Sequence, residues 1–450
     1  MDGFARCDVT SRVFRPAERR GDHVDGKGHA LSDGLAGGNR SRSAMIVIGG
    51  TMTPGTRPSA GEHSPVLAPL AVLVSSALLV LSQLYLAIPL APVIGHVLRA
   101  DGSAAAAAMG TTYALAYGLG FLIFGPLSDR YGRKPILVPG MAVLAVITGG
   151  LAAASSLPVV AVLRAVQGLV AASFSAAALA YVGEAFPPRW RPTGIGAMST
   201  AFLSAGILGQ VYAQAVADAL GWRWVFGLAV PAFVILAVAL ATILREPPRP
   251  DQPVSLGQKY RALRTLAARR ELFLVNASSF PVLLSLVGMY AALGPLLQTH
   301  FRLDQTAVLF VRLAGLPAML LAPVAGWLIG RHGPTRVAIV GFLLAATGLV
   351  AEAISVGALW ALVIASMVFV LGVAAIIPST IALVGSRGGS SRAGALALNG
   401  LVVFAGASCG PLAAQLPIGF SGLMLGFAVM LMIASGLVAI SSRRTAEVTV

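Results

Sequence analysis

The chain has 450 residues, of which 57% are hydrophobic and 11% charged, and its formal net charge is +15. Soluble domains average about 45–50% apolar and about 25% charged residues, so this composition excludes a disordered chain, an ordinary soluble enzyme and a disulfide scaffold. The basic residues are not interleaved with aromatic ones, and the chain's two cysteines (Cys7 and Cys409) lie far apart in the sequence, so we expect no nucleic-acid partner and no metal site.

The first segment, residues 1–65, is polar and rich in Gly, Arg and Ser. It carries nine basic and seven acidic residues and lacks the apolar run of a signal peptide. Such a composition does not form a core. Two interpretations stay open: a disordered cytoplasmic tail, or a misassigned start codon with translation beginning at Met45 or Met52.

From residue 66 onward, apolar runs long enough to span a membrane as helices follow one another. Six are predicted at 67–92, 103–124, 136–155, 158–182, 194–217 and 222–244. After a polar stretch, six more are predicted at 272–298, 306–329, 336–355, 358–384, 393–417 and 419–440. Because the runs are apolar on every face, they exclude alternating barrel strands and predict an all-α integral membrane protein with 12 transmembrane helices.

This pattern predicts a six-helix bundle at 66–244, a cytoplasmic linker at 245–270, a second bundle at 271–442 and a cytoplasmic tail at 443–450. Prolines end the sixth helix, and residues 255–270 are predicted to form an amphipathic basic helix on the inner membrane surface.

Loop charge predicts the orientation. Arg and Lys concentrate in the loops on the side of the N-terminus, whereas the opposite loops contain Arg99, Arg223 and Arg302. Because cytoplasmic loops collect basic residues, we expect a multi-pass protein of the cell membrane with both termini in the cytoplasm.

A motif lies between the second and third predicted helices, where residues 125–135 read GPLSDRYGRKP. Gly125 favours close helix approach and Gly132 a tight turn. Asp129 is the acid of a basic loop, with Arg130, Arg133 and Lys134 as candidate partners.

These residues resemble the G-x-L-x-D-R-x-G-R-[RK] signature of the major facilitator superfamily (MFS), over a chain region of about 66–445. The resemblance implies the MFS fold, with two six-helix bundles related by pseudo-two-fold symmetry. It also implies a conformational latch, which closes the cytoplasmic side in the outward-open form. The latch residues are Gly125, Asp129, Arg130, Gly132 and Arg133.

A degraded copy of the motif occurs 201 residues later, where residues 326–333 read GWLIGRHG. Gly330 replaces the acid of the first copy. The second loop is therefore predicted to keep the structure but to form a weaker charge latch, as part of a repeat of one half upon the other.

The fourth predicted helix contains Arg164 and Gln167 in a stretch similar to the R-x-x-Q-G element of the same superfamily. An intramembrane charge indicates a functional site unless it reaches the membrane surface. The resemblance implies that Arg164 influences proton coupling, together with Asp129 or Glu184. The fifth helix has Gln210 where drug antiporters often carry a proline.

Polar residues within the spans are the candidate substrate ligands, because the family's fold places its cavity between the two halves. They are Gln83, Tyr113, Tyr117, Gln167, Gln210, Asn276, Tyr290, Arg312 and Asn399. A mostly neutral, aromatic set suits an amphiphilic or uncharged solute, and Arg164 and Arg312 also leave an anionic solute open.

The resulting hypothesis is a monomeric, drug-efflux-like secondary transporter that works by alternating access on a proton gradient, without another cofactor. Its partners are a small solute and membrane lipids. The alternatives are an uptake symporter or a non-transporting membrane protein or enzyme. An enzyme is disfavoured because His96, His300 and His332 are scattered and neither a nucleophile–base pair nor a phosphate loop occurs.

Overall fold

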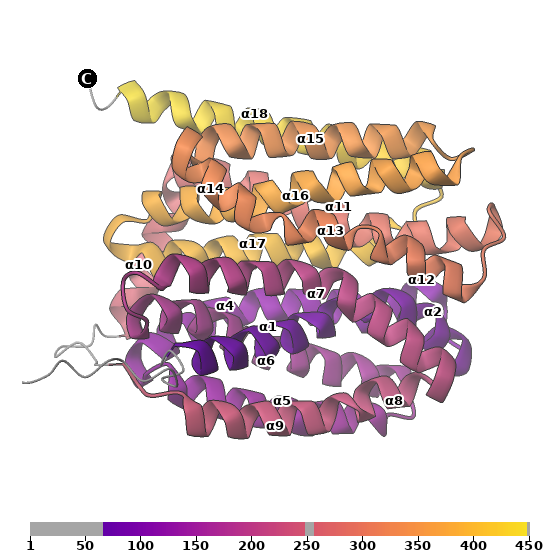
Figure 1. Cartoon of the computed structure of the whole chain (residues 1–450), viewed down its shortest axis with the longest axis horizontal. Helices are drawn as coiled ribbons and strands as arrows, with labels where there is room; N and C mark the ends of the chain where they lie inside the picture. The colour runs from indigo at the N-terminus through magenta and orange to yellow at the C-terminus, as the bar shows by residue number, and fades with distance from the viewer. Residues whose placement is uncertain (1–65, 248–255, 448–450) are drawn as a thin grey trace, which may run out of the picture. The chain divides into compact units, whose positions relative to one another are not determined.

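The computed structural model describes residues 66–247 and 256–447. The predicted tail 1–65, the alternative starts Met45 and Met52, and residues 248–255 lie outside the described residues. Within the described ranges the regular structure is entirely helical, and twelve segments are long and apolar enough to cross a membrane (Figure 1).

The first half forms six such segments. Their elements are α1 (Leu67–Tyr85) with α2 (Ala87–Val97), α3 (Gly102–Ala106) with the π-helix η1 (Ala107–Thr111) and α4 (Thr112–Tyr131), α5 (Lys134–Ala152), α6 (Leu157–Ala185), α7 (Arg191–Leu220), and α8 (Trp222–Gly227) with α9 (Ala229–Ile243). The linker helix is α10 (Leu256–Ala268).

The second half repeats this organisation. Its elements are α11 (Arg270–Thr299), α12 (Gln305–Leu313) with α13 (Leu316–Leu320) and α14 (Ala322–His332), α15 (Pro334–Ile354), α16 (Leu359–Arg387), the short 3-10 helix η2 (Gly389–Ser391), α17 (Arg392–Ala413) and α18 (Gly419–Glu447).

Several predicted helices are interrupted, and prolines account for the breaks. A proline lacks the N–H that would bond the carbonyl four residues earlier, and its ring crowds that carbonyl. Accordingly α1 ends four residues before Pro89, α8 four residues before Pro231, and α12 four residues before Pro317. Pro281 and Pro378, in contrast, lie inside unbroken helices. A proline alone therefore does not interrupt a helix, and the packing around it decides whether the helix breaks.

The motif in the first half is also more helical than predicted. Residues 125–131 form the last two turns of α4 rather than a loop, and the chain turns at Gly132, where φ is +101°. Gly333, the equivalent residue of the second half, has φ +81° at the end of α14. A left-handed conformation favours glycine, so both turns confirm the predicted role of this position.

Helix packing shows the internal repeat directly. In the first half α1 packs on α7 and α9, while α5 packs on α6 and α9. In the second half α11 packs on α17 and α18, while α15 packs on α16 and α18. Each helix contact in the first half therefore has an equivalent in the second half, between the helices that come six spans later in the chain. This is the pseudo-two-fold arrangement expected for the fold.

The halves meet along a seam with two equivalent sides. On one side α4 packs on α17, and on the other α7 packs on α12, α13 and α14. On the seam Gly118 faces the Leu401 carbonyl, 3.1 Å from where a Cβ would lie. The predicted close approach at Gly125 is wrong, because a Cβ there would meet Ala397 only at an ordinary 3.8 Å.

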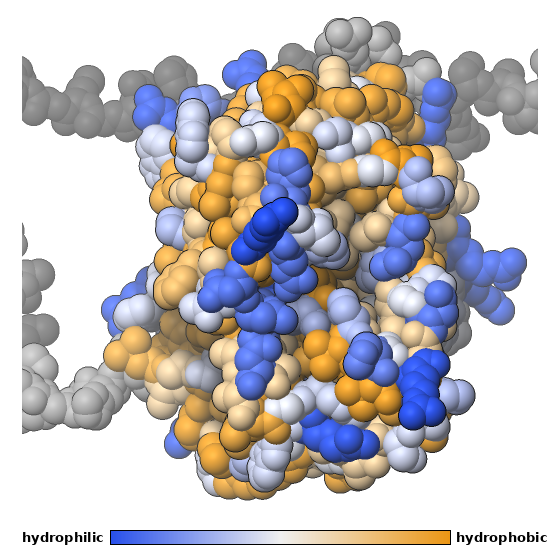
Figure 2. Space-filling view, turned by 90° about the vertical axis from the view of Figure 1, so that its right-hand side faces the viewer, coloured by the Kyte–Doolittle hydropathy of each residue, from blue (hydrophilic) through white to orange (hydrophobic). Residues whose placement is uncertain are grey.

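The two ends of the helices differ. One end, here named the basic end, carries Arg133, Lys134, Lys259, Arg331 and Arg387, with α10 beside it (Figure 1). The opposite end carries α2, α8 and α12, and Figure 2 shows hydrophilic residues scattered among apolar ones across it.

Candidate functional site

Arg164 is 0% exposed in α6, so the alternative that it reaches the membrane surface is wrong. Its three guanidinium nitrogens donate to the Met109 carbonyl (2.9 Å), the Gln83 carbonyl (2.7 Å) and the Gln167 side chain (2.7 Å). The Tyr113 ring lies over it, with the centroid 4.2 Å away. Met109 belongs to the π-helix η1, where the ordinary helical bonding is interrupted and a carbonyl becomes available.

The same cluster contains three of the predicted substrate residues. Gln167 donates to the Gln83 side chain at 3.2 Å and to Thr148 at 2.9 Å, and the Tyr113 hydroxyl donates to the Val80 carbonyl at 3.2 Å. These side chains therefore bond one another inside the first half. The cluster ties α1, α5, α6 and η1 together.

A second group lies on the seam. Tyr117 packs on Phe404 of α17 with ring centroids 4.3 Å apart, and its hydroxyl bonds Ser175 of α6. On the other side Arg312 of α12, 5% exposed, donates to Gln214 of α7 at 2.6 Å. The Tyr117–Phe404 and Arg312–Gln214 contacts cross between the halves.

The remaining predicted ligands lie apart from both groups. Asn399 of α17 donates to Asn276 (3.1 Å) and Ser279 (2.9 Å) of α11, which ties two helices of the second half. Gln210 bonds the Gly206 carbonyl of its own helix. The structure thus distributes the nine predicted substrate residues over several clusters and does not bring them into one cavity.

A cavity of about 250 Å³ lies between the halves, toward the end with α2. Its lining comes from both halves and is almost entirely apolar. The lining residues are Leu84, Ala87, Ile88, Ala91, Pro92, Gly102, Ala106, Gly110, Val287, Ala291, Pro295, Ala407, Pro411 and Gln415. None of the nine predicted ligands is among them, since those residues were chosen as polar or charged and the side chains of this wall, Gln415 excepted, are apolar.

At the basic end the motif forms an ion-pair network. Asp129 accepts from Arg133 at 2.6 Å, and Arg133 also binds Glu184 of α6 at 2.7 Å. Burial lowers the pKa of Arg133, but the bonds to Glu184 and Asp129 outweigh that effect and keep the pKa above its ordinary value. The guanidinium therefore remains charged and joins two acids.

The second partner of Asp129 is Lys259 of α10, at 2.8 Å. This contact connects the motif to the linker helix, which packs in turn on α17 and α11. Glu246, just after α9, accepts from the backbone amides of Arg133 (2.8 Å) and Lys134 (2.7 Å). The sequence analysis did not identify Lys259 or Glu246 as partners of the motif. The available signal for Lys259 was that it is the one lysine on a linker whose other basic residues are arginines.

Two predicted groupings are assembled only in part. Of the predicted partners of Asp129, Arg133 pairs with it, whereas Arg130 is exposed and lies over the Tyr131 ring at 5.5 Å. Glu184 joins Asp129 through Arg133, but Arg164 is 20 residues from Glu184 on the same helix, a separation of about 30 Å. The predicted trio of Asp129, Glu184 and Arg164 is therefore split between the basic end and the interior.

Glu352 of α15 is a buried acid that the substrate prediction left out. It is 0% exposed, and neither carboxyl oxygen has a hydrogen-bond partner among the described residues. It lies two residues before the end of α15. Among those same residues, no three His, Cys, Asp or Glu side chains are grouped closely enough to hold a metal ion.

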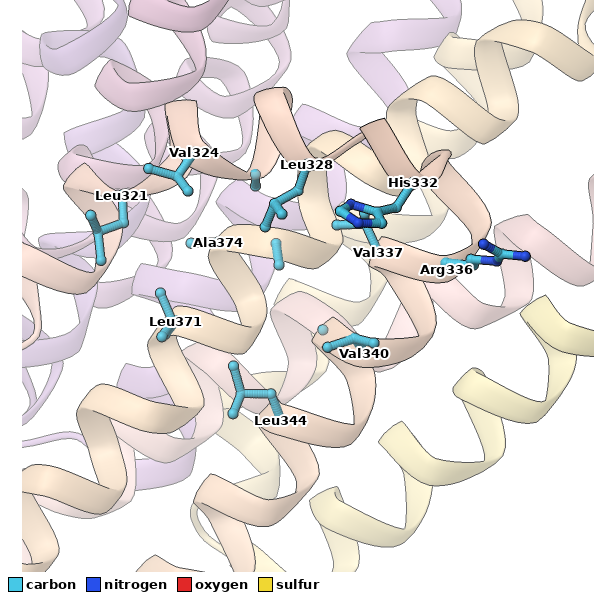
Figure 3. A pocket seen from close by; sticks show the side chains of 13 residues that line it. Leu321, Val324, Leu328, His332, Arg336, Val337, Val340, Leu344, Leu371 and Ala374 are labelled. Carbon is cyan, nitrogen blue, oxygen red and sulfur yellow. The ribbon is translucent and has the colours of Figure 1, made fainter. Parts of the chain in front are cut away.

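A further cavity, of about 540 Å³, lies away from the seam between α14, α15 and α16 (Figure 3). Leu321, Val324, Leu371 and Leu344 line one part of it, and the polar side chains His332 and Arg336 stand at the other end (Figure 3). An aliphatic wall of this kind suits a lipid chain better than a polar solute.

The sequence matches the family model for the Major Facilitator Superfamily over residues 73–320, more than half of the chain. The chain belongs to the major facilitator superfamily. Both the family and the fold are those of transporters rather than enzymes, and the twelve apolar helices are those of a multi-pass membrane protein.

Several relatives are similar over part of the chain. An uncharacterised MFS-type transporter of Mycobacterium tuberculosis is 31% identical over 32% of this chain and 24% of its own length. The multi-drug resistance efflux pump PmrA of Streptococcus pneumoniae is 29% identical over 65% of this chain and 73% of its own. Multidrug resistance protein 3 of Bacillus subtilis is 29% identical over 30% of this chain and 26% of its own. This chain spans about a quarter of the first relatives it matches, at 24%, 25% and 22%.

Solved structures share the fold. An inward-facing bacterial homolog of the human lysosomal transporter Spinster matches with TM-scores of 0.64 unoccupied and 0.65 occupied. Each comparison covers 86% of this chain and 98% of that one at 17% sequence identity. At that identity the likeness supports the arrangement of helices alone.

Proposed function

We propose that this chain is a secondary transporter that exports small amphiphilic or uncharged solutes by alternating access, using a proton gradient as its energy source. It would work as a monomer in the cell membrane, with both termini in the cytoplasm. The orientation rests on loop charge, since basic loops stay cytoplasmic.

The seam is the observation that carries this proposal. Helices related by the internal repeat pair along it, and a cavity of about 250 Å³ with an apolar wall lies between them. Parallel repeats that rock about a site between them are the general design of such carriers. The wall offers little to a sugar or a phosphate, because a polar group buried there would lose its hydrogen bonds to water.

Export is favoured by two relatives whose names are those of multidrug resistance and efflux proteins. Gln210 stands against a close match to the drug antiporters, so the solute class rests on the cavity rather than on the fifth-helix motif. We further propose that a lipid acyl chain fills the groove between α14, α15 and α16, with an anionic headgroup at His332 and Arg336.

The test uses the full chain in proteoliposomes, with ethidium as the amphiphilic probe and an imposed pH gradient. We expect the wild type to accumulate ethidium only while the gradient lasts. Asp129→Asn should abolish this accumulation although the protein still inserts, because Arg133 and Lys259 lose their shared counter-ion.

Asp304→Asn is the matched control. Asp304 is exposed and caps α12 through the Ala307 amide at 2.9 Å. Asn caps a helix about as well as Asp, so this variant removes one carboxylate and keeps the structure. Wild-type accumulation in Asp129→Asn would contradict the role of the latch, and a wild type that never responds to the gradient would contradict proton coupling.

A further inference from the structure

The first half joins its helices at the basic end with its own acids. Glu246, just after α9, accepts from the backbone amides of Arg133 and Lys134 at the start of α5, at 2.8 and 2.7 Å. Glu184, near the end of α6, accepts from the Arg133 guanidinium at 2.7 Å. Two carboxylates therefore connect three helix ends, and the two basic side chains beside them balance their charge.

The equivalent place in the second half is a cavity of about 800 Å³. It lies among the starts of α11 and α15 and the last turns of α16 and α18, the helices that come six spans after α1, α5, α6 and α9. It shares no lining residue with the groove of α14, α15 and α16. Its polar lining includes Arg269, Arg270, Glu271, Thr335, Ser386 and Arg387.

The charges around this cavity differ from those of the first half. The helices α6 and α16 have 29 residues each, and the residue before the last is Glu184 in α6 but Ser386 in α16. The last residue is Ala185 in α6 but Arg387 in α16. The lining contains three arginines against one glutamate, and none of these arginines forms an ion pair within the described residues. The cavity therefore has a surplus of positive charge.

Arg387 is fixed in place with part of its guanidinium unused. It is half-buried, and its Nη1 donates to the Ser441 hydroxyl at 3.0 Å and to the Glu271 carbonyl at 3.4 Å. No described residue accepts from its Nε or Nη2. An arginine binds phosphate through two such parallel N–H groups. Loop charge explains why arginines lie at this end, but it does not require one to be fixed inside a cavity.

The start of α15 adds backbone donors. The first-turn amides of a helix have no partner within the helix, and they favour a negative charge. In α5 the acid of Glu246 accepts from them. The first turn of α15 contains no acidic residue, and no described carboxylate accepts from the amide of Thr335. An anion in the cavity would meet donors that the first half satisfies internally.

We propose that this cavity binds a phosphate-bearing anion, which replaces in the second half the carboxylates of Glu184 and Glu246. The anion accepts from Nε and Nη2 of Arg387 and from the Thr335 amide, and it connects the ends of α11, α15, α16 and α18. The phosphate belongs either to a lipid headgroup at the basic end or to a soluble compound, and both offer the same oxygens. This inference does not depend on the proposed transport.

The first test follows the thermal unfolding midpoint of the purified full chain, because a ligand that binds only the folded protein raises it. Inorganic phosphate is compared with chloride at equal ionic strength, and short-chain phosphatidylglycerol with phosphatidylcholine of the same chains. A rise with both phosphate probes supports a site for either source. A rise with one alone supports the site and identifies that source. The proposal is overturned if neither probe stabilises the protein more than its control does.

The second test changes the proposed ligand. Arg387→Gln should weaken binding by about tenfold or more, measured from the concentration of phosphate probe that raises the midpoint. Arg261→Gln removes an exposed arginine of α10 outside the cavity and should keep the wild-type affinity. Each variant is compared with itself without ligand, so a lower basal stability does not affect the result. Unchanged affinity in Arg387→Gln, or an equal loss in Arg261→Gln, overturns the proposal.

The third test supplies the missing acid. Ser386→Glu places a carboxylate where α6 has Glu184, so it should raise the midpoint without ligand and remove the further rise with phosphate. Ser386→Gln is the matched control, since Gln has nearly the same shape without the charge, and it should do neither. A full wild-type response to phosphate in Ser386→Glu would show that the anion binds elsewhere, which overturns the proposal.

Discussion

Arg164 and Arg312 are the two buried arginines of the described residues, one in each half of the molecule. Arg164 forms three hydrogen bonds to groups of its own half and lies under the Tyr113 ring. Arg312 donates to Gln214 of the other half at 2.6 Å. The same residue type at similar burial therefore ties helices within one half in the first case, and joins the two halves in the second.

The motif loops differ in a related way. Asp129 in the first half joins Arg133 and the linker residue Lys259, whereas Gly330 in the second half contributes no charge. Both loops keep the glycine turn, at Gly132 and Gly333. The glycine turn reverses the chain direction in both halves. The ion pair between Asp129 and Lys259 connects the motif to the linker in the first half only.

The largest expected effect separates the two arginines. Arg164→Met removes three charge-assisted hydrogen bonds and leaves their acceptors buried, so stability should fall by about 3 kcal/mol or more. Arg312→Met removes the bond to Gln214 and should cost about 1.5 kcal/mol. Thermal unfolding of both variants in detergent measures the two losses of stability. Equal losses would contradict the difference between an arginine bonded within one half and an arginine that joins the halves.

The next effect concerns the repeated turn. Gly132→Ala and Gly333→Ala place a side chain in a left-handed conformation, which costs roughly 1–2 kcal/mol at each position. Gly330→Ala is the control, since nothing lies within 4 Å of the added Cβ and the residue is helical. It should stabilise the fold by up to about 1 kcal/mol. The thermal unfolding midpoints of Gly132→Ala and Gly333→Ala should therefore both lie below that of Gly330→Ala. If either turn variant is as stable as Gly330→Ala, the two glycines do not have the same structural role.

The smallest effect tests the link between motif and linker. Lys259→Gln removes a partly exposed ion pair, worth less than about 1 kcal/mol. A difference of that size can still change the ratio of two conformations by up to about fivefold, which initial ethidium transport rates would register. Arg261→Gln, exposed on the same helix, is the control. Identical rates in the two variants would mean that α10 is only a connection.

Much of this architecture follows from local sequence. The prediction of twelve spans, two halves and a linker helix needed only the length of apolar runs, because lipid requires each spanning segment to satisfy its own backbone as a helix. The breaks within spans were less predictable. Pro89 and Pro317 interrupt helices while Pro281 does not, and the difference lies in the packing around each proline rather than in the residue.

The site was predicted less well than the fold, for a physical reason visible in particular residues. Asp129 and Arg133 are four residues apart on one helix turn, so local spacing was enough to pair them. Lys259 and Glu246 reach the same motif from 130 and 113 residues away, and spacing says nothing about them. Gln167 and Asn399 were interpreted as ligands because they are polar, but each is used to bond a neighbouring helix.

Hydropathy and the motif by themselves determined the helical membrane fold, its division into two halves and the family, because these depend on each segment's own solvent and on short-range spacing. Only the tertiary structure decided that Arg164 is sealed within one half, that Arg312 crosses the seam and that the cavity wall is apolar. It also decided that Glu352 is buried without a partner. Those features depend on which helices face one another, and a polar residue in an apolar run has the same sequence signature whichever way it faces.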